Sequence, residues 1–180
     1  MLQITIPATE QWDEAKEEYV YTKERTLQLE HSLVSLSKWE SKWCKPFLSN
    51  KNITEEETMD YIRCMTLTQN VPKEVYDYIP DSIVEQITAY INAPMTATYF
   101  SGNENKRMNR EIVTSELIYY WMVALNIPFE CQKWHLNRLL TLIRVCNIKN
   151  TPPKKRSKRS IMSRNAALNA ARRQQLGSSG

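Results

Sequence analysis

Cysteine and histidine are the first side chains to consider for chemistry, because two of them stand close together. Cys131 and His135 are four residues apart, a spacing that places both on one face of a helix and suits two ligands of a zinc ion. A structural zinc site needs four ligands. Cys146 lies too far along the same expected helix, and His31 and Cys64 belong to other elements. We therefore expect no metal site and interpret the pair as a core cysteine beside a hydrogen-bonded histidine.

Catalysis by a thiol or by paired carboxylates is not expected either. A nucleophilic cysteine needs a neighbour that lowers the pKa of its thiol, and nothing around the two histidines predicts a pocket. Four carboxylates cluster near the middle of the sequence, at Glu55, Glu56, Glu57 and Asp60. This cluster is typical of the solvated first turn of a helix, where acidic side chains complement the helix dipole.

Glycine is scarce, which excludes several enzyme classes. The 180 residues contain three glycines, Gly102, Gly177 and Gly180, where about 7% is usual. Phosphate-binding loops need glycine for tight turns and close backbone approach. The sequence contains no G-x-G-x-x-G, no Walker A motif and no G-x-S-x-G. We expect no enzyme, with no catalytic, cofactor-binding or metal-binding residues.

The N-terminal part of the sequence predicts short strands. Leu2, Ile4 and Ile6 alternate with polar residues, the period of a half-buried strand. Similar alternation at Tyr19–Thr22 and Thr26–Glu30 predicts a small antiparallel sheet. The acidic segment Trp12–Glu18 is interpreted as a loop or turn.

Helices are expected to follow, since apolar residues recur three and four positions apart. The expected helices begin after Ser32, at the T-x-x-E capping box of Thr54 and Glu57, at Pro80, at Arg110 and at about Glu130. The last two, Arg110–Leu125 and Glu130–Cys146, are expected to pack antiparallel at the centre of the core because their connection is short. Leu136, Leu139, Leu140 and Ile143 form the apolar stripe of the second.

Aromatic side chains are plentiful, with five Trp, nine Tyr and three Phe. The pair Trp39 and Trp43 and the run Tyr119–Trp121 are expected to lie mainly in the core. Any aromatic side chain left exposed there would be an anchor for an interface.

The charge distribution divides the chain near residue 150. Residues 151–180 contain eight Lys and Arg and no acidic residue. The other 16 of the chain's 24 basic residues and all 20 acidic residues therefore lie in residues 1–150.

We predict an α+β, mainly α protein. Residues 1–150 would form a globular helical domain with N-terminal strands, and residues 151–180 a basic linker and Ala-rich helical arm. The linker would extend from Thr151 to Arg159, because two prolines oppose a helix there. The cations expected to bind a partner are Lys154, Lys155, Arg156, Lys158, Arg159, Arg164, Arg172 and Arg173.

The cellular compartment is predicted from three negative features. The four cysteines form no C-x-x-C motif, the N-terminus resembles no signal peptide, and the longest apolar run, Leu117–Leu125, is far shorter than the ~20 residues of a membrane span. We expect a cytoplasmic protein with free thiols and no membrane partner.

Three segments, Leu29–Trp43, Ser115–Cys146 and Arg164–Gly177, resemble small proteins from the tail-gene modules of tailed bacteriophages, of the kind classed as tail assembly chaperones. The resemblance implies a non-enzymatic role in the host cytoplasm. Such proteins bind the long tape-measure protein, keep it soluble and help tail-tube subunits to assemble around it.

Two other function classes stay open. One is a phage structural protein of the tail or neck, which would be retained in the virion. The other is a nucleic-acid-binding regulator, since Lys and Arg clusters neutralise phosphates without sequence preference. Residues 151–180 contain no aromatic side chain to stack on bases, which weakens binding to single strands. An inert, solvated extension is a further alternative.

Overall fold

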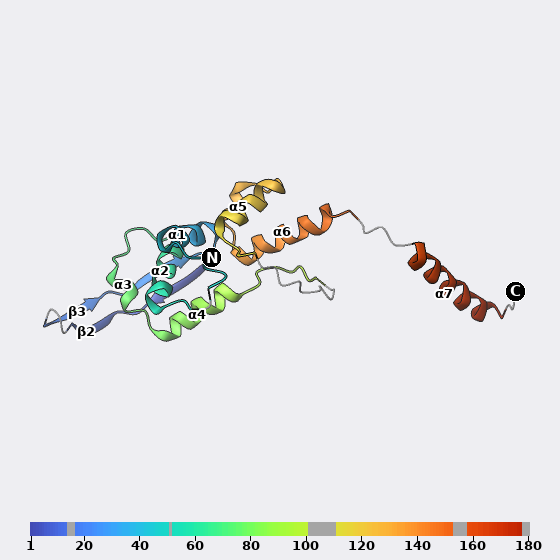
Figure 1. The fold of residues 1–180 in the computed structure, drawn as a ribbon. Coiled ribbons are helices and arrows are strands. Elements are labelled where there is room, and N and C mark those ends of the chain that lie inside the picture. Colours follow the sequence, from blue (N-terminus) through green and yellow to red (C-terminus); the bar gives the residue numbers. More distant parts are fainter. Residues whose placement is uncertain (14–16, 51, 101–110, 153–157, 178–180) are drawn as a thin grey trace. The chain divides into compact units, whose positions relative to one another are not determined.

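The structure is a computed structural model that describes residues 1–13, 17–50, 52–100, 111–152 and 158–177. The chain divides into two compact units, Met1–Asn147 and Ile148–Gly180. Within the described residues there are seven α-helices and a small N-terminal antiparallel β-structure (Figure 1). The expectation of a mainly helical protein with N-terminal strands is confirmed.

The strands form two antiparallel ladders in nested order. β1 (Leu2–Ile6) pairs with β4 (Arg25–Leu29), and β2 (Thr9–Asp13) pairs with β3 (Glu18–Thr22). The expected strands are confirmed to within one residue. The interpretation of Trp12–Glu18 as a loop was wrong at both ends, because Trp12 lies in β2 and Glu18 begins β3.

Strand β2 was missed because its residues are mostly polar. Across the ladder of β2 and β3, the exposed Tyr21 hydroxyl donates a 2.7 Å hydrogen bond to Glu10 Oε1. The ladder of β1 and β4 follows the expected alternation, since Ile4, Ile6 and Leu27 are buried. Helix α4 (Asp81–Asn92) packs against β1.

Helices α1 (Leu33–Trp43) and α2 (Glu55–Met65) pack against one another as the centre of the fold (Figure 1). Each begins at the N-cap that the sequence predicts, Ser32 for α1 and Thr54 for α2, and each has a capping box. A proline cannot continue a helix, so Pro46 would end α1. The helix already ends at Trp43, because the next residue, Cys44, adopts a left-handed conformation with φ 52°.

Helix α3 (Glu74–Asp77) is a single turn that the sequence pattern does not reveal. Helix α4 begins after Pro80 as expected, and its buried residues Ile83, Ile87 and Tyr90 recur three and four positions apart.

The predicted hairpin of two long helices is corrected in four respects. Helix α5 (Ser115–Ala124) begins only after Thr114, whose side chain accepts a hydrogen bond from Leu117 N, and it packs chiefly on α1. The segment expected as one helix from Glu130 is a 3₁₀ turn, η1 (Phe129–Lys133), followed by α6 (Leu136–Asn150). Leu136, Leu139 and Ile143 are buried, whereas Leu140 is only partly buried.

The second unit contains helix α7 (Lys158–Leu176). The helix expected from Ser160 begins two residues earlier, so Lys158 and Arg159 are helical rather than part of a linker. Residues 153–157, the centre of that predicted linker, lie outside the described residues. All side chains described in α7 are exposed.

Candidate functional site

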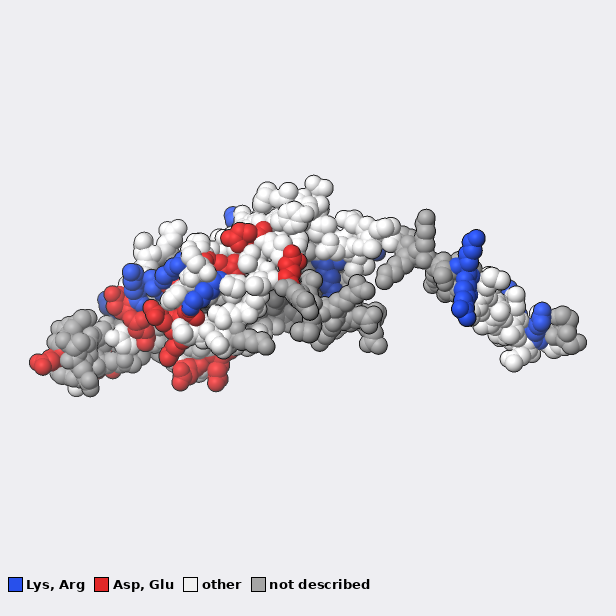
Figure 2. All heavy atoms as spheres, viewed as in Figure 1, with Lys and Arg blue, Asp and Glu red and all other residues white. Residues whose placement is uncertain are grey.

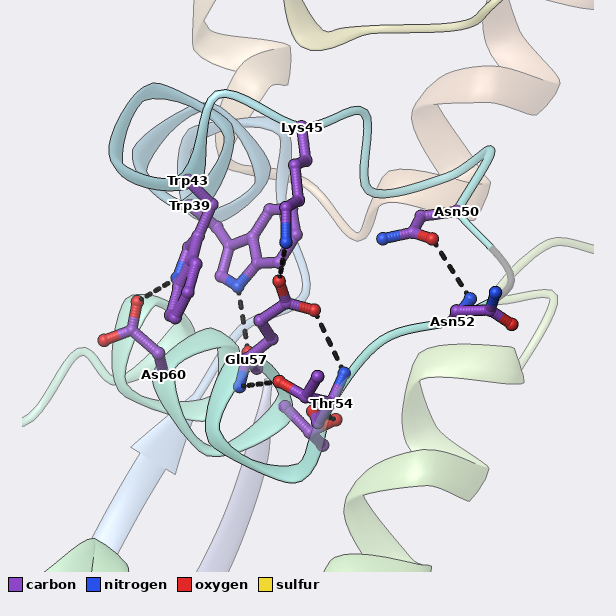
Figure 3. Close-up of polar contacts among 9 residues, drawn as sticks. Trp39, Trp43, Lys45, Asn50, Asn52, Thr54, Glu57 and Asp60 are labelled. Carbon is purple, nitrogen blue, oxygen red and sulfur yellow. Dashed lines mark hydrogen bonds and ion pairs between the residues drawn. The ribbon is translucent and has the colours of Figure 1, made fainter.

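The seam between α1 and α2 brings the aromatic pair Trp39 and Trp43 together with two of the clustered carboxylates, Glu57 and Asp60 (Figure 3). Trp39 is fully buried, and its indole Nε1 donates a 2.9 Å hydrogen bond to the backbone carbonyl of Glu57. Its ring stacks on Trp43, 6.1 Å between centroids. The prediction that these tryptophans are mainly core is confirmed, because Trp43 is also partly buried.

Glu57 is a buried anchor rather than a solvated helix start. Its backbone N–H donates to Thr54 Oγ1, and its Oε2 accepts from Thr54 N at 3.0 Å, which completes the capping box (Figure 3). Its other oxygen, Oε1, accepts from Lys45 Nζ. The hydrogen bond from Lys45, followed by that from the Thr54 backbone, lowers the pKa of Glu57 below its usual value.

Asp60 is likewise held in place. Its Oδ2 accepts from Trp43 Nε1 at 2.9 Å, and its Oδ1 accepts from Lys42 at 2.5 Å with Arg63 at 3.5 Å. Burial by itself would raise the pKa of Asp60, but the hydrogen bonds from Lys42 and Trp43 and the charges of Lys42 and Arg63 outweigh it and lower the pKa. The interpretation of Glu57 and Asp60 as solvated was wrong, whereas Glu55 and Glu56 are exposed as expected.

Two histidines that are far apart in the sequence meet in the core. The His31 and His135 rings contact edge to face at 5.1 Å, and His31 Nδ1 lies 2.6 Å from the Tyr61 hydroxyl in a hydrogen bond. His135 Nδ1 accepts from Asn137 N, so its Nε2 donates to the Tyr90 carbonyl at 3.0 Å. Burial, with a smaller contribution from His135, lowers the pKa of His31 to about 4.

These contacts hold both histidines within the core. Both are neutral at pH 7 because burial lowers both pKa values. Cys131 lies in η1 and His135 precedes α6, so the two do not share a helix as expected. In the described part of the chain, no three His, Cys, Asp or Glu side chains gather as ligands for a metal ion.

The outer side of α5 is an exposed apolar surface. Only Ser115, Ile118 and Met122 of this helix are buried, whereas Tyr120 is 64% and Val123 60% exposed. The expectation of a helix at the centre of the core was therefore wrong. Its apolar residues surround the helix, yet its buried residues lie along one side.

The eight predicted partner-binding cations divide between described and undescribed residues. Five lie in α7 and are exposed: Lys158, Arg159, Arg164, Arg172 and Arg173. The other three, Lys154, Lys155 and Arg156, lie outside the described residues. No acidic residue accompanies the cations of α7.

The described helices include none that is long and apolar enough to span a membrane. Comparison with protein-family models, with curated protein sequences and with solved structures finds no match to this chain. The assignment of binding residues therefore depends on the contacts, burial and charge of the chain itself.

Proposed function

We propose that the protein is a non-enzymatic tail assembly chaperone of a tailed bacteriophage. It binds the tape-measure protein in the host cytoplasm and helps tail-tube subunits to assemble around it. Helix α7 carries this proposal, because a helix of 19 residues with exposed side chains and unopposed positive charge is typical of a segment that orders on a partner.

The exposed side of α5 supports the same proposal from the first unit. An aromatic side chain such as Tyr120 on an exposed helix is the kind of residue that anchors protein interfaces. The apolar side of a helical partner would bury this surface of α5.

Deletion of residues 151–180 tests the proposal. We expect the shortened protein to keep its melting temperature and to recover at least about tenfold less tape-measure protein on co-expression, since its charge contribution is lost. Lys23→Gln with Arg25→Gln, a change of two exposed cations in the N-terminal hairpin, is the matched control and should not alter recovery. Equal recovery with and without residues 151–180 would contradict a role for α7.

Nucleic acid is the second candidate partner, and the absence of acidic residues among 151–180 favours it. Binding of this kind weakens steeply with salt, because counterions are released from the phosphates. A gel-shift titration with duplex DNA and RNA at two salt concentrations distinguishes it from the chaperone. A phage structural protein would instead be detected in purified virions.

A further inference from the structure

A groove follows the seam of α1 and α2 and consists of three adjoining clefts, which we name together the α1–α2 groove. The first, of about 210 Å³, has an apolar wall formed by Val34, Cys64, Met65 and Leu67 beside Glu30 and Lys133. The second, of about 510 Å³, is lined by Lys38, Lys42, Arg63, Lys73 and Tyr76 around Asp60. The third, of about 470 Å³, extends to Glu55, Glu56 and Asp77.

The clefts form a series because each shares residues with the next. Lys38 and Cys64 line both the first and the second cleft, and Lys42 and Arg63 line both the second and the third. Each of the two helices contains 11 residues, which corresponds to about 16 Å at 1.5 Å per residue. The groove therefore has room for about three turns of a helix.

The middle of the groove has excess positive charge. It contains four cations and one carboxylate, Asp60, which already pairs with Lys42 and Arg63. Lys38 and Lys73 form no ion pair with any residue that the structure describes, and both are exposed. Lys and Arg side chains gather beside Asp and Glu side chains over the region of α1 and α2 (Figure 2).

We propose that the α1–α2 groove binds a peptide segment of a protein partner with an apolar end, an acidic middle and a basic far end. Such a segment complements the order of the three clefts, apolar, basic and acidic. A nucleic acid carries negative charge throughout, so Glu55, Glu56 and Asp77 would repel it at the third cleft. This site belongs to the first unit and does not depend on the role proposed for α7.

Two fluorescein-labelled helical peptides of identical composition test the proposal by anisotropy with the full chain. One peptide has leucines at one end, glutamates in the middle and lysines at the other end, and its counterpart exchanges the glutamates and lysines. We expect the glutamate-centred peptide to bind at least about tenfold more tightly, because only its charges complement the groove. Equal affinity of the two peptides, or no binding of either, would overturn the proposal.

Substitutions locate the site within the groove. Lys38→Glu with Lys73→Glu should weaken binding of the glutamate-centred peptide at least about tenfold, and Leu67→Ser should weaken it through the apolar end. Lys149→Glu, an exposed cation of α6, is the control for a change in net charge and should have little effect. Because the groove side chains of Lys38 and Lys73 are exposed, the melting temperature should not change.

Unchanged affinity in the Lys38 and Lys73 double variant would place the peptide elsewhere and overturn the assignment. Tighter binding of a labelled oligonucleotide than of either peptide, weakened by Lys38→Glu with Lys73→Glu, would place nucleic acid in the groove and overturn the choice of a protein partner. Recovery of tape-measure protein is measured separately with the same variants. The two proposals can therefore be contradicted separately. Peptide binding without recovery of the tape-measure protein would contradict only the chaperone role. Recovery that depends on residues 151–180, without peptide binding, would contradict only the groove.

Discussion

The α1–α2 seam and helix α7 are both rich in charged residues, but the charges have different surroundings. In the seam, the carboxylates of Glu57 and Asp60 are buried and accept hydrogen bonds from lysine and tryptophan side chains. In α7, the described lysines and arginines are exposed and no acid lies near them in the sequence. Charge is thus fixed by pairing within the fold in the seam, and it is available to a partner in α7.

The largest expected contrast is in large-to-small substitution. Trp39→Ala should lower the free energy of unfolding by about 3–5 kcal/mol, because it leaves a cavity beneath α2 and removes the hydrogen bond to Glu57. Tyr120→Ala on the exposed side of α5 is the matched aromatic control and should change it by less than about 0.5 kcal/mol. Urea unfolding measures both, and equal losses would mean that α5 is as deeply packed as the seam.

Acid should destabilise the first unit next most strongly. The pKa of His31 is about 4 in the folded protein and about 6.5 in an unfolded chain. The unfolded state therefore binds more protons between these values, and stability falls as the pH falls through this window. We expect a loss of about 2 kcal/mol between pH 7 and pH 5.

Chemical denaturation at several pH values measures this loss, and His31→Gln should flatten the profile. Helix α7 contains only Lys and Arg as ionisable residues, so the pH dependence should survive deletion of residues 151–180. A profile that becomes flat on that deletion would contradict the assignment to His31.

A smaller effect is expected at the helix caps. Thr54→Ala removes the side chain that accepts from Glu57 N and should destabilise the protein by about 1 kcal/mol. Ser163→Ala, an exposed hydroxyl of α7, should stay within about 0.5 kcal/mol. Thermal unfolding of the two variants measures the difference between their losses of stability. Equal losses would mean that the Thr54 cap contributes nothing.

The smallest effect on stability is expected for the cations of α7. Arg172→Ala with Arg173→Ala should change the free energy of unfolding by less than about 0.5 kcal/mol, because both side chains are exposed. The same variant should weaken recovery of the partner if α7 binds it. A loss of more than about 1 kcal/mol in urea unfolding would show that these arginines contribute to folding.

Much of the secondary structure is determined by local sequence. The alternation of Leu2, Ile4 and Ile6 and the capping residues Ser32 and Thr54 predict elements that the structure contains. These signals succeed because strand period and helix caps depend on residues within one or two turns. The division of the predicted helix Glu130–Cys146 into η1 and α6 was missed. The apolar residues of the two elements form one continuous pattern in the sequence.

The tertiary structure alone distinguishes the buried carboxylates from the exposed ones. The sequence places Glu57 and Asp60 beside two exposed glutamates, and burial against α1 distinguishes them. The contact of His31 with His135, the exposure of Tyr120 and the groove between α1 and α2 likewise arise from packing between distant segments. Local patterns report which face of an element is apolar, whereas burial and pairing depend on what lies against that face.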